Sequence, residues 1–262
     1  MLEDLGRQLA FHGRAIGWSW RAGTRYRAEV MRLLAEVSMG TGGLAVIGGT
    51  ATIVAFMTFF TGTEVGLQGY NALNQIGTEA FTGFVSAYFN TREIAPIVAA
   101  LALSGTVGCG FTAQLGAMRI NEEIDALQVM AVPPVPFLVT TRIIAGLVAV
   151  VPLYVIGLLS SFFATRLIVT LFFHQSVGTY DHYFRLFLPP YDVFWSFGKV
   201  LLFSVVITMI HCYYGFNSVG GPAGVGVAVG RSIRASIVTV AVLDLLLGMA
   251  IWGTTTTVRI AG

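Results

Sequence analysis

The sequence predicts an all-α polytopic membrane protein. Of its 262 residues, 55% are hydrophobic and only 11% are charged, and the mean hydropathy is +0.78. A soluble domain carries about a quarter charged residues, so this surface could not be kept in water. The 31 glycines lie among long apolar runs, as is typical of closely packed membrane helices. The formal charge of +2 and the scattered arginines exclude a nucleic-acid-binding protein.

The apolar runs predict about five transmembrane helices. A bilayer core of about 30 Å needs about 20 helical residues per crossing. The first expected span runs from about 39 to 62, and the other four are centred on 94–115, 143–165, 200–214 and 237–254. Residues 63–92 are too apolar for a free loop. We expect them to hold the far end of the first helix, a turn and the start of a long second helix.

The first 37 residues differ in composition from the transmembrane domain expected over 38–262. Six arginines alternate there with leucines, aromatic residues and the tryptophans Trp18 and Trp20. This mixture predicts an amphipathic helix in the membrane interface; a solvated basic tail is the alternative. With the N-terminus in the cytoplasm, ten of the 15 basic residues lie on the cytoplasmic side. Five spans then place the C-terminus outside.

A polar segment, 116–134, interrupts the apolar sequence between the second and third spans. Its apolar residues repeat at helical spacing, and Pro133 and Pro134 end the pattern, so we expect a short amphipathic helix. The acids Glu122, Glu123 and Asp125 lie on one face. On the cytoplasmic side, such a helix suits docking into a groove on a soluble partner. A solvated connecting helix is the alternative.

The outer loop and the cysteines offer little chemistry. His174 and His182 are eight residues apart, which fits no compact metal-ligand pair, so we expect an amphipathic helix on the outer surface instead. Cys109 and Cys212 lie in apolar runs and are predicted to be buried thiols. Glycine pairs such as Gly62 with Gly66 allow close helix packing, and dimerisation through them is plausible.

Three charged residues fall inside the predicted spans. Arg92 and Glu93 open the second span, and Asp244 lies in the middle of the fifth. A charge in the bilayer costs at least about 2.5–3.5 kcal/mol, so each should face a cavity or a partner. For Arg92 and Glu93 the alternative is an ion pair in the interface. Asp244 is expected to cap or pair within the bundle rather than to relay protons.

Catalytic motifs are absent from the sequence. No nucleophile elbow, HExxH zinc helix or Rossmann fingerprint occurs in a suitable context. A P-loop needs Gly-Lys followed by Ser or Thr, and the sole lysine lies in Gly198-Lys199-Val200. ATP-driven work must therefore come from another subunit. A membrane-embedded enzyme of lipid metabolism would need intramembrane His or carboxylate clusters, and Asp244 is the only carboxylate expected deep in a span.

Several ordered motifs resemble the MlaE/YrbE permease family from about residue 30 to the end. They are Gly66-Leu67-Gln68-Gly69-Tyr70, Arg92-Glu93-Ile94-Ala95-Pro96, Leu115-Gly116-Ala117-Met118-Arg119, Glu122-Glu123-Ile124-Asp125-Ala126-Leu127 and Leu243-Asp244. Where many relatives carry an arginine and a glutamate, this chain has Val107 and Gln114. That departure resembles the B-type YrbE subunit of actinobacterial Mce systems, which implies a heterodimer with an A-type YrbE permease.

The resemblance implies the permease subunit of an Mce-type ABC transporter that moves hydrophobic lipids across the inner membrane, with import as the favoured direction. It implies two cytoplasmic ABC ATPases, which hold the ATP and Mg, a hexamer of Mce proteins, and no cofactor in this chain. The segment after the second span would be the coupling helix, with Arg119, Glu122, Glu123, Asp125 and Leu127 in contact with the ATPase. The lipid pocket would include Tyr70, Leu73, Ile76, Arg92, Glu93 and Ile94. The alternative is a membrane anchor for the Mce assembly, with the partner permease carrying the lipid path.

Overall fold

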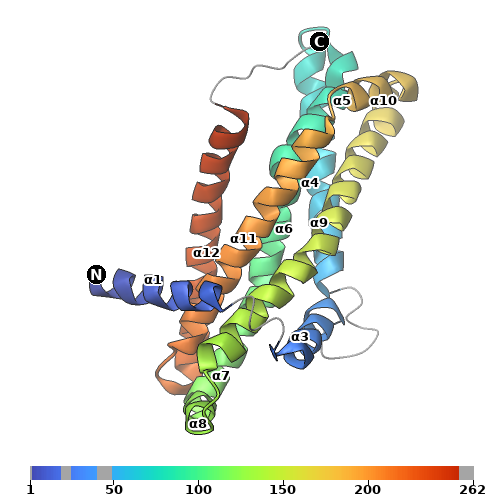
Figure 1. Ribbon diagram of the computed structural model, residues 1–262. Helices are drawn as coiled ribbons and strands as arrows, with labels where there is room; N and C mark the ends of the chain where they lie inside the picture. The colour runs from blue at the N-terminus through green and yellow to red at the C-terminus, as the bar shows by residue number, and fades with distance from the viewer. Residues whose placement is uncertain (1, 19–24, 40–48, 254–262) are drawn as a thin grey trace.

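The computed structural model describes residues 2–18, 25–39 and 49–253, and this part of the chain is helical and contains no strand. Five helices are long and apolar enough to cross a membrane, which confirms the predicted number of spans. They cover Gly49–Asn74 (α4), Glu79–Ile120, Val135–Phe172, Pro190–Phe216 (α11) and Gly221–Trp252 (α12). They lie side by side as one elongated bundle (Figure 1).

The second and third spans are built from several helical segments. The second consists of η2 (Glu79–Phe81), α5 (Thr82–Val85), η3 (Ser86–Ile94), α6 (Ala95–Leu103), η4 (Ser104–Gly108) and α7 (Cys109–Ile120). The third consists of η5 (Val135–Thr140), α9 (Thr141–Leu167) and η6 (Ile168–Phe172). The segments η3, η4, η5 and η6 are π-helical. Such turns are rare and often mark functional positions, and η3 carries Arg92 and Glu93.

Two spanning helices begin well before the segments on which the predicted spans are centred. The fourth begins at Pro190, before 200–214, and the fifth at Gly221, before 237–254. Charged residues and glycines lower the hydropathy of these stretches, but they do not end a helix when the bundle pairs the charges. The first spanning helix is described from Gly49 to Asn74, so the apolar residues after 62 belong to it as expected, and residues 40–48 of its predicted start lie outside the described residues.

Glycine contacts pack α4 against α9 within the chain. A Cβ atom on Gly62 would lie 2.5 Å from the carbonyl oxygen of Ser161, so only glycine fits at this contact. Thr165 of α9 donates a hydrogen bond of 2.6 Å to the carbonyl of Gly62. Gly66 faces Thr165 and Ile168 in the same way. This glycine pair therefore joins two spans of one chain, which replaces dimerisation as the use of this motif.

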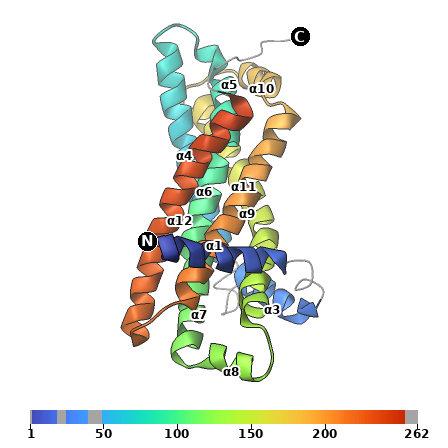
Figure 2. The same cartoon turned by 60° about the vertical axis from the view of Figure 1, so that its left-hand side comes forward.

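The N-terminal helix α1 (Leu2–Gly17) runs across the long helices instead of along them (Figures 1 and 2). The ring of Phe11 is buried, with its centroid 5.5 Å from that of Tyr213 and 5.4 Å from that of Phe216. Thr140 donates to the carbonyl of Ala15 at 2.9 Å. Trp20 lies outside the described residues. The position of α1 in a membrane interface stays a prediction, as does a separate segment over 1–37.

Three shorter helices complete the structure. Helix α3 (Arg27–Met39) packs against α9. Helix α8 (Glu123–Val129) lies at one end of the bundle and α10 (Val177–Leu186) at the opposite end (Figures 1 and 2). Both of these connecting helices were expected from the amphipathic sequence between the spans.

Candidate functional site

Arg92 pairs with a carboxylate from another span. Its Nε and Nη2 atoms lie 2.9 and 2.7 Å from Oδ2 of Asp192 on α11. The indole nitrogen of Trp252, at the end of α12, donates to Oδ1 of the same carboxylate at 2.8 Å. The guanidinium carbon lies 4.1 Å from the ring centroid of Tyr88 and 5.0 Å from that of Trp252. Both oxygens of Asp192 are thereby engaged, and Arg92 links three spans.

Lys199 is the second cation of this cluster. Its side chain is fully buried, and its Nζ lies 2.7 Å from Oδ1 of Asp244 on α12 and 3.5 Å from Oε1 of Glu93. It also donates to the carbonyl of Arg92 at 2.9 Å. A buried ammonium is tolerated only with such partners, because desolvation of an unpaired charge costs several kcal/mol. We call Arg92, Glu93, Asp192, Lys199 and Asp244 the charged cluster.

Hydrogen bonds hold the π-helical turn of η3 against α11. The carbonyl oxygen of Thr91 accepts a hydrogen bond from Ser196, just as that of Arg92 accepts one from Lys199. Ser196 in turn accepts a hydrogen bond of 2.9 Å from the hydroxyl of Tyr154 on α9. Second, third and fourth spans are therefore tied together at the level of the charged cluster.

The structure changes two expectations about these charges. Arg92 and Glu93 do not form an ion pair with each other; each faces a residue of opposite charge from another helix. Asp244 pairs within the bundle, as expected. Asp244 is not isolated from other carboxylates, because Glu93 and Asp192, which lies in the first turn of α11, belong to the same cluster. Sequence reasoning missed Asp192 and placed Lys199 just before the fourth span.

The remaining residues predicted for a lipid pocket have different surroundings. Tyr70 stacks on Phe173, with ring centroids 4.0 Å apart, at the end of the bundle that carries α10. Leu73 and Ile94 are half-buried, and Ile76 is 71% exposed. Arg92 and Glu93 face α11 and α12 instead. The structure thus divides the predicted set into an apolar group near the tip of α4 and a charged group on η3.

A second polar network surrounds His211 inside the bundle. Its Nδ1 lies 2.9 Å from the hydroxyl of Thr112, and its Nε2 lies 3.1 Å from that of Ser104. Ser232 and Ser236 of α12 approach these two hydroxyls at 3.2 and 2.6 Å. All five side chains are buried. Sequence reasoning missed this network, and a lone histidine within an apolar helix is the signal that could have found it.

Helix α8 is anchored on its inner side and exposed at its end. Ile124 is fully buried, and Arg119 of α7 forms a 2.8 Å ion pair with Asp125. The residues Glu122 and Ala131, on either side of the helix, have left-handed backbone conformations with φ of 59° and 57°. Glu122 and Glu123 are exposed and Leu127 is half-buried.

Two apolar side chains at the end of α8 are largely exposed in the part of the chain that the structure describes. Val129 is 89% exposed and Met130 is 63% exposed. A hollow beside them runs between α8, α1 and the end of α11. Exposed apolar residues of this kind next to a polar helix face are typical of a docking surface.

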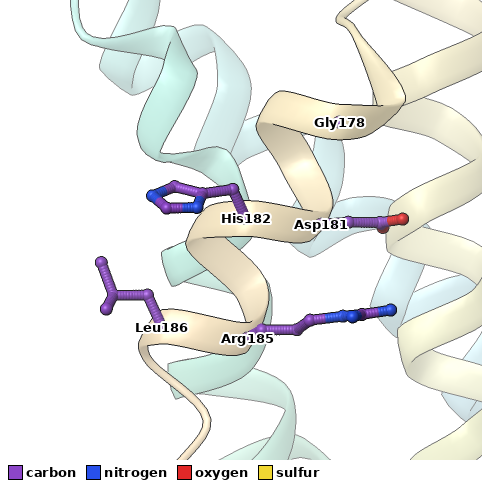
Figure 3. A pocket seen from close by; sticks show the side chains of 5 residues that line it. All are labelled: Gly178, Asp181, His182, Arg185 and Leu186. Atoms are coloured by element: carbon purple, nitrogen blue, oxygen red, sulfur yellow. The ribbon is translucent and has the colours of Figure 1, made fainter.

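The opposite end carries a shallow hollow on α10 (Figure 3). His182 and Leu186 point to one side of the helix, while Asp181 and Arg185 point to the other, toward α9. Arg166 of α9 donates to both oxygens of Asp181 at 2.9 and 3.1 Å, and these bonds lower the pKa of that carboxyl. Among the described residues, no group of three or more His, Cys, Asp or Glu side chains could hold a metal ion.

Comparisons with known proteins agree with this architecture. Residues 41–250 match the family described as Permease MlaE. A probable ABC transporter permease protein of Rickettsia bellii is 30% identical over 194 residues, which cover 74% of this chain and 73% of the relative. The intermembrane phospholipid transport system permease protein MlaE of Haemophilus influenzae is 26% identical over 96% of this chain and 97% of its own length. The chloroplastic protein TRIGALACTOSYLDIACYLGLYCEROL 1 of Arabidopsis thaliana is 26% identical over 72% of this chain and 54% of its own length.

Proposed function

Because the chain belongs to the MlaE permease family, we propose that it is the permease subunit of an ABC transporter that moves hydrophobic lipids across the inner membrane. The Haemophilus relative is named for phospholipid transport, which supports a lipid as the cargo. The observation that carries the proposal is α8, a short helix fixed to the end of a spanning bundle with uncovered apolar side chains. Such a helix can receive force from a separate ATPase.

The contacts of α8 give a route for that force. Ile124 and the pair between Arg119 and Asp125 attach α8 to α7. Helix α7 belongs to the same continuous span as η3, which carries Arg92 and Glu93 of the charged cluster. A displacement of α8 would therefore reach the contacts between the second span, α11 and α12. We assign ATPase contact to Arg119, Glu122, Glu123, Asp125 and Leu127, and add Val129 and Met130.

The lipid path is proposed to include Tyr70, Leu73, Ile76, Arg92, Glu93 and Ile94. Helices α4 and α12 have the lowest buried shares of the five spans, 22% and 17%, so their surfaces are available to lipid and to a second permease. The proposed partners are an A-type YrbE permease, two ABC ATPases holding ATP and Mg, and a hexamer of Mce proteins. Import is the proposed direction, with the N-terminus in the cytoplasm and the C-terminus in the periplasm.

Purification of the tagged chain from its own cells in mild detergent tests the proposal. We expect an ATPase, a second permease and Mce proteins to accompany it. Val129→Asp combined with Met130→Asp should remove the ATPase and leave the bundle folded, because both side chains are largely exposed. Leu186→Asp, an exposed apolar residue on α10, is the matched control and should retain the ATPase.

Lipid uptake by the intact assembly separates this function from that of a membrane anchor. Tyr70→Ala and Leu73→Ala should reduce uptake while the assembly still forms. Uptake that is unchanged in both variants would favour the anchor, with the lipid path in the partner permease. An assembly without any ATPase would refute the proposed coupling by α8.

A further inference from the structure

The charged cluster holds more carboxylates than cations. Arg92 and Lys199 face Asp192, Glu93 and Asp244, so full ionisation would leave one negative charge in excess. Asp192 is satisfied by Arg92 and Trp252. Among the described residues, Glu93 and Asp244 have only Lys199 between them, so the excess falls on this pair. Asp244 is buried, and an uncompensated charge at a buried carboxyl costs several kcal/mol, which the uptake of one proton removes.

The geometry of the two carboxyl groups fits a shared proton. Oε1 of Glu93 and Oδ1 of Asp244 face the same ammonium, that of Lys199, at 3.5 and 2.7 Å. Two carboxylates can accept but not donate hydrogen bonds, so a proton on one of them would allow a hydrogen bond between the pair. Glu93 also contacts Gly248, which lies one turn after Asp244 on α12. A Cβ atom on Gly248 would lie 3.7 Å from Oε1 of Glu93. The side chain of Glu93 therefore packs against α12, the helix that carries Asp244.

The groups that surround the pair favour a proton over a metal ion. Lys199 from α11 lies against both carboxyls, and Arg92 with its partner Asp192 flanks them. Tyr88 from η3 stacks on Arg92, on the same side of the cluster. Two fixed cations would repel a bound metal ion, whereas a proton needs no coordination shell. The Glu93 side chain is 36% exposed, so the proton can be exchanged without opening the bundle.

We propose that Glu93 and Asp244 bind one proton between them and that this proton fastens α12 to the second span. Helix α12 is the least buried of the five spanning helices, and Asp244 is one of its few buried residues. Loss of the proton leaves the carboxylates of Glu93 and Asp244 both ionised, with only the ammonium of Lys199 beside them. The resulting repulsion loosens α12 from η3. This inference concerns the bundle alone and does not depend on the proposed lipid transport.

Infrared difference spectroscopy of the full chain in lipid nanodiscs, between neutral and alkaline buffer, tests the proposal. The carbonyl stretch of a protonated carboxyl should disappear on alkalinisation. Glu93→Gln and Asp244→Asn should each abolish this band, because either variant leaves two cations facing two carboxylates. Glu64→Gln alters an exposed carboxylate that accepts a hydrogen bond from Gln68, and it should leave the band unchanged. A wild-type spectrum without the band, or a band that survives in either cluster variant, would overturn the proposal.

Thermal unfolding against pH supplies a second measurement. If the folded chain holds a proton that the unfolded chain releases, its stability falls as the pH rises through the titration of the pair. The amide of Glu93→Gln can donate a hydrogen bond to Asp244 without a titratable proton, so the stability of this variant should change less over the same pH range. Equal pH profiles for the wild type and this variant would contradict the inference. A failure of transport with both results intact would bear only on the proposed function.

Discussion

Replacement of Lys199 by methionine should be among the most damaging single changes in this bundle. Methionine has a similar length and is apolar, so it leaves little empty space, but it removes the ammonium that lies 2.7 Å from Asp244. Asp244 is 6% exposed and cannot be rehydrated in place. Loss of one partner from a buried ion pair costs about 3–5 kcal/mol, since the remaining charge is left without compensation.

Equilibrium unfolding in mild detergent measures this loss. Removal of both charges in Lys199→Met with Asp244→Leu should recover most of the stability, because an apolar pair of similar volume replaces the ions. Arg166→Met is the control: its pair with Asp181 is partly exposed, with side-chain exposures of 46% and 33%, and should be worth less than about 1 kcal/mol. The reasoning is refuted if Lys199→Met costs no more than the control or if the double variant is no more stable than Lys199→Met alone.

Three further changes give separate tests. Gly62→Ala should destabilise the chain by about 1–3 kcal/mol in the same unfolding assay, because its Cβ would lie 2.5 Å from a backbone oxygen of α9, whereas Gly110→Ala, with no atom within 4 Å, should not. The lowered pKa of Asp181 predicts that its ion pair stabilises the fold by less than about 1 kcal/mol at neutral pH, and that this stabilisation is lost as the pH falls through the pKa of the folded state. In Arg166→Gln, this contribution to the decrease of the melting temperature at acid pH should be absent. Arg92→Lys keeps the charge but loses one of two contacts to its carboxylate and the stacking on Tyr88, so lipid uptake should fall while the same subunits still co-purify. A wild-type level of uptake in this variant would show that Arg92 acts only as a charge.

The elements predicted best from the sequence are those whose patterns are local. Apolar runs long enough to cross a bilayer give the number of spans, and Pro133 with Pro134 limits the helix before the third. The start of α11 could not be predicted in this way, because Asp192 and Lys199 lower the hydropathy of its first turns. Their cost is offset by Arg92 and Asp244, which are distant in the sequence.

The candidate site was predicted only in part for the same reason. Arg92, Glu93 and Asp244 stand out as charges in apolar sequence, but their partners follow from how three helices are arranged in space. The π-helical form of η3, which presents Arg92 and Glu93 to two different helices, has no simple signature in the sequence. The ends of α8 and the exposure of Val129 likewise depend on how the neighbouring helices pack, which the local sequence does not show.

The hydroxyl network around His211 bears on how α12 can move along its own axis. Ser232 and Ser236 are one turn apart on the same face of α12, and each meets a hydroxyl near one nitrogen of the imidazole ring. A slide of α12 by one turn, about 5.4 Å, would bring one serine to the place that the other leaves. Hydroxyl groups can exchange donors and acceptors by rotation, so part of this network could form again after such a slide.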